Sequence, residues 1–284
     1  MRSADSARSA AALWDIATPA RPAGPRGLSM AGFRARSQEL VDLGVVPYPA
    51  VTLVLDLGDG PLAVGDGTGR PQGGGLVLGL ASSGVRGSGR GIECLQLRLS
   101  PVLAHAVLGG GAARAGGEVL PLEGLWGREA GRIEERLRAA GEWEERFALV
   151  AQALARRAAA GRAVDPEVAH AWHRLAASRG TARVERIAEE VGWSRKRLWS
   201  RFRDQLGLGP KRAAQLIRFD HAAHLLAAGR SAAGVAAQSG YADQSHLHRE
   251  VLAFTGATPS AVAAAPWLAV DHVAWADPGY LSGR

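Results

Sequence analysis

Apolar positions in the first half of the chain form short runs of the kind that β-strands show. The clearest runs are Val51 to Leu57, Leu76 to Leu80 and Ile92 to Leu99, and glycine-rich turns lie between them. Short strands at such intervals are typical of a small barrel or sandwich. We therefore predict a β-rich domain over residues 28–124.

Residues 1–27 carry no comparable pattern. They are rich in Ala, Arg, Ser and Pro, and their apolar run from Ala10 to Trp14 is too short for the core of a signal peptide. We expect a disordered leader here. No run in the chain approaches the roughly 20 apolar residues that a membrane-spanning helix needs, so we expect a cytoplasmic protein.

Over residues 125–179 the apolar spacing changes to three and four, which predicts helices. Ile133, Leu137 and Ala140 begin one stripe, and Gly141 separates it from a second. We expect this segment to be a helical connector. The sequence leaves open whether its stripes pack within one chain or join two copies in a homodimer.

Residues 180–264 contain one helical pattern twice. An alanine precedes a glycine by four residues and an aromatic residue follows the glycine: Ala188, Gly192 and Trp193, then Ala236, Gly240 and Tyr241. The small alanine lets two helices approach, and glycine can end a helix in the left-handed conformation. The pattern predicts two helix-turn-helix units, joined by a helix over residues 210–228. Residues 265–284 are expected to form a C-terminal tail.

The second helix of each unit is expected to face DNA. Ser194 and Asp243 are suitable N-caps, and their helices would expose amides and polar side chains to a duplex. Buried pairs at spacing i, i+4 would dock each helix: Leu198 with Phe202, and Leu247 with Val251. The remaining outward positions predict the DNA-contacting residues Arg195, Lys196, Arg197, Trp199, Ser200, Arg201, Gln244, Ser245, His246 and Arg249.

The position of the positive charge along the chain supports this interpretation. The formal net charge is +7, and residues 181–260 hold 12 Lys or Arg against 7 Asp or Glu. Most of the excess positive charge therefore lies in the predicted helix-turn-helix region, which favours a polyanionic partner such as double-stranded DNA.

The second copy of the pattern resembles the AraC/XylS family of bacterial transcription regulators. The resemblance rests on Gly240 to Arg249 and on the closing Gly256 to Pro259, and it covers about 80 to 100 residues. Two departures are the apolar but smaller Val251, where phenylalanine is usual, and Gly234 inside a helix. Glycine lowers helix propensity by about 1 kcal/mol, so we expect the second unit to bind DNA less firmly.

The resemblance implies an α+β protein, with an N-terminal cupin-like β-barrel domain and following helices before the all-α double helix-turn-helix domain. It implies a sequence-specific regulator, with a small-molecule effector in the barrel and RNA polymerase as a further partner. Whether it activates or represses stays open. Base-facing residues would be Lys196, Trp199 and Ser200 in the first unit and Gln244, Ser245, His246 and Arg249 in the second, with Arg195, Arg197 and Arg201 near phosphates.

Two alternatives remain from the residues themselves. One is an enzyme localised on DNA, for example an alkyl-repair protein with Cys94 as acceptor, although nothing beside Cys94 in the sequence would activate it. The other is a non-specific DNA-packaging protein. We expect a buried structural thiol, no metal or cofactor and no catalytic residues.

Overall fold

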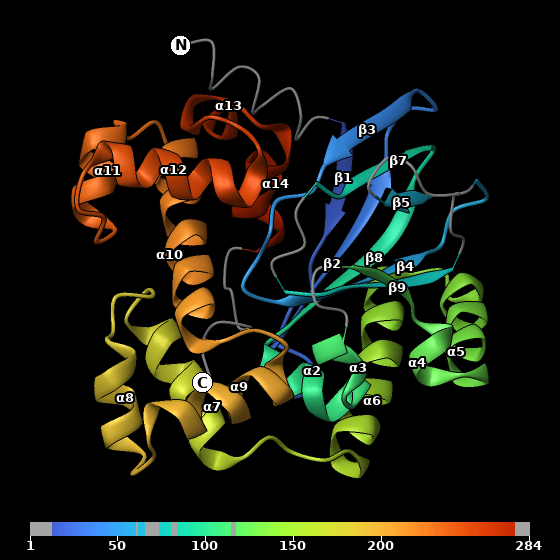
Figure 1. Cartoon of the computed structure of the whole chain (residues 1–284). Helices are drawn as coiled ribbons and strands as arrows, with labels where there is room; N and C mark the ends of the chain where they lie inside the picture. The colour runs from blue at the N-terminus through green and yellow to red at the C-terminus, as the bar shows by residue number, and fades with distance from the viewer. Residues whose placement is uncertain (1–12, 61, 66–73, 81–83, 115–117, 276–284) are drawn as a thin grey trace.

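The computed structural model describes residues 13–60, 62–65, 74–80, 84–114 and 118–275. A β-rich N-terminal part is followed by helices through to the C-terminal end of the described chain (Figure 1). The predicted α+β class is confirmed.

Within the described residues the strands form two antiparallel sheets. In the larger sheet the order is β1-β2-β8-β4-β6-β9, and in the smaller one it is β3-β7-β5. The strands are β1 Trp14–Ala17, β2 Leu28–Ala35, β3 Leu40–Gly44, β4 Val51–Asp56, β5 Ala63–Gly65, β6 Gly75–Leu78, β7 Arg86–Arg90, β8 Glu93–Leu99 and β9 Val119–Pro121. The three apolar runs of the sequence correspond to β4, β6 and β8, as predicted.

The alternation of side chains along β8 separates two environments. Leu95, Leu97 and Leu99 are buried in a core shared with the following helices. Cys94 belongs to a second core, in which residues of both sheets meet. Because side chains alternate across a strand, Gln96 and Arg98 share the inner face with Cys94. The inner face therefore carries polar groups into the space between the sheets.

The leader was wrongly predicted for residues 13–27. Trp14 pairs with Ala35 where β1 joins the edge of the larger sheet, and its ring packs edge-on against Phe33 at 6.0 Å. Apolar Trp14 and Ile16 alternate around Asp15, so four residues suffice to bury one face of a strand. Residues 1–12 lie outside the described residues.

The middle helices cover the outer face of the larger sheet (Figure 1). They are α2 Pro101–Leu108, α4 Glu123–Trp126, α5 Arg128–Ala139 and α6 Trp143–Ala160. The short α3 Gly111–Arg114 packs against α2, and α7 Pro166–Ala177 packs against the helices that follow it. The apolar stripes of α5 and α6 are buried within the chain, with Leu137 and Leu154 both 0% exposed. Of the two arrangements that the sequence left open, packing within one chain is therefore the one these stripes adopt.

The remaining helices are α8 Val184–Glu190, α9 Arg195–Leu206, α10 Pro210–Ala227, α11 Ala232–Gln238, α12 Gln244–Thr255, α13 Pro259–Ala263 and α14 Pro266–Ala274. Residues 265–275, expected only as a tail, include the helix α14, which packs against α10, β1 and β3. No helix in the described ranges is long and apolar enough to cross a membrane.

Candidate DNA-binding interface

The first helix-turn-helix unit consists of α8 and α9. Ala188 is 2% exposed where the two helices meet, and Gly192 has a φ of 67°, in the left-handed region. The Trp193 amide closes the turn by donating to the Ala188 carbonyl oxygen at 2.9 Å. The Ser194 hydroxyl caps α9 by accepting from the Arg197 amide. The predicted turn and cap of this unit are confirmed.

The second unit, α11 and α12, repeats this geometry. Ala236 is 3% exposed, Gly240 has a φ of 72°, and the Tyr241 amide donates to the Ala236 carbonyl oxygen at 3.0 Å. Asp243 caps α12 by accepting from the amide of His246 at 2.7 Å. The expected docking pairs of both units are buried: Leu198, Phe202, Leu247 and Val251 are each 0% exposed.

The helix α10 joins the two units, which lie toward its opposite ends (Figure 1). At the second unit, Phe219 of α10 stacks on Phe254 of α12 with ring centroids 4.9 Å apart. At the first, Ala213 and Ile217 share a core with α7, α8 and α9. Both units are thus packed on one continuous helix.

A partly buried ion pair orients α12 on α10. The Arg218 guanidinium donates to both carboxylate oxygens of Glu250, at 3.1 and 2.6 Å, and the Tyr241 hydroxyl donates to Glu250 at 2.8 Å. Burial, together with the Glu250 charge, raises the pKa of Tyr241. The sequence gives no signal for this network, because its members are polar residues that the helical pattern assigns to no common face.

The predicted contact residues of α9 are exposed but differ in their partners. Lys196 and Ser200 face solvent, whereas Arg195 lies 3.4 Å from Glu185. Arg197 stacks over Trp193 at 4.5 Å, so its guanidinium stays near the surface of the turn. Arg195 can therefore reach a phosphate by leaving an exposed partner, and Arg197 by leaving a partly buried ring at the surface of the turn.

The side chains of two further α9 residues, Arg201 and Trp199, contact other parts of the protein. Arg201 forms a two-bond ion pair with Asp165, at 2.7 and 3.0 Å. Trp199 is 48% exposed, packs closely on Gly209 and lies 5.0 Å below the Arg203 guanidinium. Its ring is therefore set against the end of α9 and partly available to a ligand.

In α12 the exposed candidates are Gln244, Ser245 and Arg249. His246 is different, because its ring packs edge-on against Tyr241 at 5.2 Å and its Nδ1 atom accepts from the Ala242 amide at 3.4 Å. The structure thus brings three of the four side chains to the open face and turns the fourth toward the turn.

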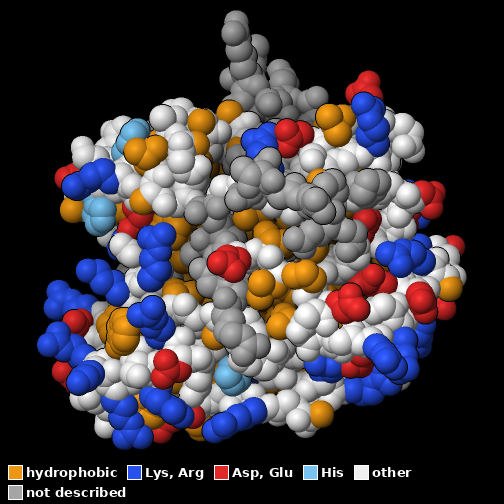
Figure 2. All heavy atoms as spheres, turned by 45° about the vertical axis from the view of Figure 1, so that its right-hand side comes forward, with side chains coloured by type: hydrophobic (Ala, Val, Ile, Leu, Met, Phe, Trp, Pro, Cys, Tyr) orange, Lys and Arg blue, Asp and Glu red, His pale blue; other side chains and the backbone are white. Residues whose placement is uncertain are grey.

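The surface charge follows this arrangement. Figure 2 shows Lys and Arg side chains gathered toward the lower left of the molecule, where the first unit lies. The cations of α9 include Arg195, Lys196, Arg197, Arg201 and Arg203. By contrast, α12 carries a single arginine, Arg249. The electrostatic attraction for a phosphate backbone is therefore concentrated on α9.

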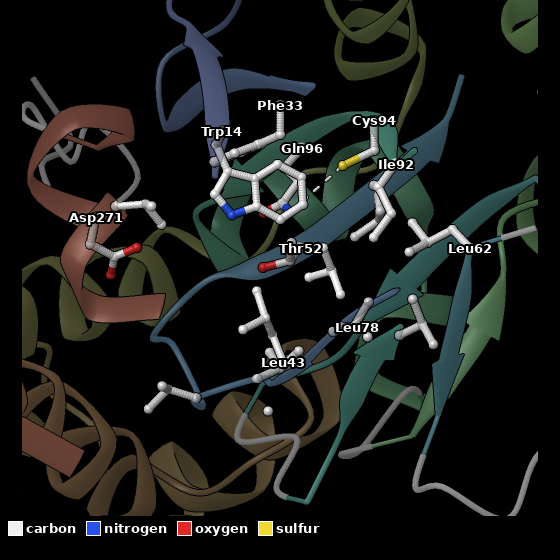
Figure 3. A pocket seen from close by; sticks show the side chains of 18 of the residues that line it. Trp14, Phe33, Leu43, Thr52, Leu62, Leu78, Ile92, Cys94, Gln96 and Asp271 are labelled. Atoms are coloured by element: carbon white, nitrogen blue, oxygen red, sulfur yellow. Dashed lines mark hydrogen bonds between the residues drawn. The ribbon is translucent and has the colours of Figure 1, made fainter. Parts of the chain in front are cut away.

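A second candidate site lies between the two sheets. It is a cavity of about 150 Å³, lined mainly by apolar side chains from both sheets and from α14. Figure 3 shows Trp14, Thr52 and Gln96 around this space, with Asp271 of α14 at its edge. A mainly apolar cavity with a few polar groups is the usual form of a small-molecule site.

A buried cluster of charges connects this cavity to α10. The Arg98 guanidinium donates to Asp271 at 3.0 Å, between the rings of Tyr48 and Trp275 at 3.5 and 4.1 Å. His224 of α10 lies 3.2 Å from the second Asp271 oxygen.

Burial and neighbouring charges set the pKa values of the titratable groups in this cluster. Burial opposes the charge of His224, but hydrogen bonding to Asp271 and the nearby Asp220 outweigh it and raise the His224 pKa to about 9. Burial raises the pKa of Asp220 to about 6. Burial also opposes ionisation of Asp271, yet Arg98 and His224 hold its pKa below the ordinary value. At neutral pH the cluster therefore holds two cations and two carboxylates.

Cys94 lies in the inner wall of the same cavity and is 3% exposed. Burial raises the pKa of its thiol to about 12, and the Gln96 side-chain amide nitrogen approaches its sulfur at 3.9 Å. The expectation of a buried thiol is confirmed. A protonated thiol is a poor nucleophile.

Comparison with protein families matches residues 168–265 to the helix-turn-helix domain family, in its AraC type. This segment contains α8 to α13, both recognition helices and most of α7. No curated protein matches the chain in sequence.

Among solved structures, ToxT from Vibrio cholerae O395 is 12% identical, with 84% of this chain and 97% of that chain covered at a TM-score of 0.46. Unsaturated fatty acid bound ToxT from Vibrio cholerae strain SCE256 is 13% identical, with 86% and 96% covered at a TM-score of 0.44. The AraC-like transcriptional activator CuxR is 17% identical, with 71% and 83% covered at a TM-score of 0.24.

The double helix-turn-helix domain defines a DNA-binding transcription regulator. The resemblance to the AraC/XylS family is confirmed over residues 168–265, where the chain contains a helix-turn-helix domain of the AraC type.

Proposed function

We propose that the protein binds DNA sequence-specifically by placing α9 and α12 in adjacent major grooves. The observation that carries this proposal is the pair of capped, exposed helices fixed on the single helix α10. With 18 residues, α10 is about 27 Å long. This is of the order of the roughly 34 Å that separates successive major grooves on one side of a duplex.

The side chains of α9 and α12 would make different kinds of contact with DNA. Lys196 and Ser200 of α9, and Gln244, Ser245 and Arg249 of α12, have exposed side chains that can meet base edges. Arg195, Arg197 and, once released from Asp165, Arg201 would anchor phosphates. Trp199 would contact sugar or a thymine methyl group, and His246 would hold the turn beside it.

Selection of random duplex DNA by the purified protein tests this proposal. We expect an enriched motif with two elements about one helical turn apart. Lys196→Ala should blur one element and Arg249→Ala the other, while Arg132→Ala, which removes an exposed charge from α5, should leave both intact. Binding without an enriched motif, with affinity set by salt alone, would favour the packaging alternative.

We also propose that a small molecule in the cavity between the sheets changes the affinity for DNA, in a protein that acts in the cytoplasm. The support is the apolar cavity, whose wall includes residues of α14, a helix packed on α10. A ligand acts by favouring one of two arrangements of the domains. Homodimers and RNA polymerase would be further partners of such a regulator.

The alkyl-repair alternative is weaker than the regulator. An alkyl acceptor needs an accessible thiolate, whereas Cys94 is buried and its pKa is raised to about 12. Slow reaction of Cys94 with a thiol reagent in the folded protein, and rapid reaction after unfolding, is the expected outcome. Rapid reaction in the folded state would reopen the enzyme alternative.

A further inference from the structure

The helix α14 forms part of the cavity wall although it follows the DNA-binding domain in the sequence. Val270, Asp271 and Trp275 line the cavity together with residues of both sheets. The same helix packs against α10. The cavity is thus bounded on one side by a segment attached to the second helix-turn-helix unit.

Charge around the cavity is balanced without a ligand. Among the described residues that line it, Arg98 is the cation, and its guanidinium is paired with Asp271. His224 balances the remaining charge of Asp271 and Asp220. An anionic ligand would have to displace Asp271 from Arg98 and leave a buried carboxylate with one partner fewer, which is strongly unfavourable.

Neutral hydrogen-bonding groups, by contrast, line the cavity. The Trp14 indole N–H and the Thr52 hydroxyl form no hydrogen bond within the described part of the chain, and Thr52 is only 9% exposed. Among the described residues, the Gln96 side chain forms a hydrogen bond only with the Cys94 sulfur, at 3.9 Å. These polar atoms line a mainly apolar cavity, so a ligand that forms hydrogen bonds with them would bind more tightly than a purely apolar one.

The size of the cavity limits its occupant. A volume of about 150 Å³ is comparable with the engineered apolar cavities that hold benzene. A ligand of this size would lie between the Trp14 and Trp275 rings and the apolar residues of the two sheets. It would touch α14 directly.

We infer that the cavity binds an uncharged, mainly apolar molecule of about one substituted ring, whose hydrogen-bonding group meets Trp14, Thr52 and Gln96, and that α14 transmits its binding to α10 through Asp271. This inference rests on the proposed effector function of the same cavity. A ligand that moves α14 changes the contact between Asp271 and His224, now 3.2 Å. His224 lies in the last turn of α10, just before the second unit, so the orientation of α12 relative to α9 changes with it.

The ligand class is tested with three single-ring probes and the full chain. Calorimetric titration should show binding of phenol, weaker binding of benzene, and binding of benzoate at least tenfold weaker than that of phenol. Gln96→Leu and Thr52→Val keep the shape of the wall and should each weaken phenol binding about three- to tenfold. The control Gln152→Leu makes the same change on the exposed face of α6 and should leave phenol binding unaltered.

Benzoate binding as tight as phenol, or no phenol binding at millimolar concentration, would overturn the inferred ligand class. Because these titrations contain no DNA, their failure leaves the proposed DNA readout standing. Conversely, if the protein without phenol selects no DNA motif, that result contradicts the proposed DNA recognition and leaves the inferred ligand class standing.

Transmission is tested by measuring affinity for the selected DNA motif with and without phenol. We expect phenol to change the wild-type affinity at least threefold, and His224→Gln to retain phenol binding while losing that change. Asp271→Asn provides a second variant, since it keeps the side-chain shape and removes the charge. A phenol effect that persists in His224→Gln, or that is absent in the wild type, would overturn the role of α14.

Discussion

The two helix-turn-helix units share their turn but differ in how their second helix is supported. In the first unit, α9 carries five cations, and its ion pairs with Asp165 and Glu185 are exposed. In the second, α12 is anchored by the buried contact of Arg218 with Glu250 and exposes mostly neutral side chains. If both helices meet DNA as proposed, the first unit would supply most of the attraction to phosphates, and the second would present a less charged surface to the bases.

The largest effect expected from this difference comes from removing the buried anchor. Glu250→Ala leaves the partly buried Arg218 guanidinium and the buried Tyr241 hydroxyl without their shared partner, and should lower the free energy of unfolding by about 3 kcal/mol. Urea denaturation measures this change. Glu185→Ala breaks the exposed pair of the first unit and should cost much less, because solvent screens the attraction between exposed charges. Equal costs for the two variants would contradict the proposed difference in support.

The glycines of the two turns offer a smaller and more local comparison. Both have positive φ, so alanine should cost about 1–2 kcal/mol at either position. At Gly192 a Cβ atom would meet open space, whereas at Gly240 it would lie 3.0 Å from the Thr181 Cγ2 atom. Gly240→Ala should therefore be the more destabilising of the two in thermal unfolding.

A second substitution isolates the contact with Thr181. Thr181→Ser removes the Cγ2 atom but keeps the hydroxyl that donates to the Ser178 carbonyl oxygen at 2.7 Å. The double variant Gly240→Ala with Thr181→Ser should then unfold with about the same loss as Gly192→Ala. If the extra cost of Gly240→Ala persists, its origin lies elsewhere than in this contact.

These local features are also those that the sequence predicted best. The turn glycines, the caps Ser194 and Asp243, and the alternation of β8 follow from spacings of a few residues, because helices and strands impose fixed periods. Sequence spacing alone therefore placed both recognition helices and named side chains that the structure exposes, with His246 the partly buried exception.

The missed features depend on residues far apart in the chain. Asp271 is 173 residues from Arg98, and in the sequence it resembles the solvated residue of an ordinary amphipathic helix. Strand β1 was missed because four residues give too short an alternation to distinguish it from a polar leader. The cavity and its link to α10 arise from these long-range contacts, which no local period records.

The buried charge cluster around His224, near the C-terminal end of α10, predicts that the stability of the protein depends on pH. The folded-state pKa of His224 is raised to about 9 from an ordinary value of 6.5. Its contribution to stability is therefore complete below pH 6.5 and is lost as the pH rises through 9. Asp220, Asp271 and His221 are the titratable groups that act on it directly, and Arg98 and Tyr48 contact Asp271.

Thermal unfolding of the wild type and of His224→Gln between pH 6 and 9.5 measures this contribution. The wild type should lose stability over the upper part of the range, and the variant should lose less. His221→Gln provides a matched control on the same helix, since burial lowers the pKa of His221 and keeps it neutral over most of this range. Parallel curves for wild type and His224→Gln would exclude His224 as the titrating group.

The smallest effect concerns Arg201, whose ion pair with Asp165 withholds one cation from the first unit. Arg201→Ala should change the free energy of unfolding very little, because the pair is largely exposed and screened by solvent. Asp165→Asn should free the guanidinium for a phosphate and steepen the dependence of log Kd on log salt by about one unit. Adding Arg201→Ala to Asp165→Asn should remove that increase, whereas adding Arg132→Ala should not. If the slope of log Kd against log salt is unchanged in Asp165→Asn, Arg201 contributes to the fold of the first unit and not to its binding of DNA.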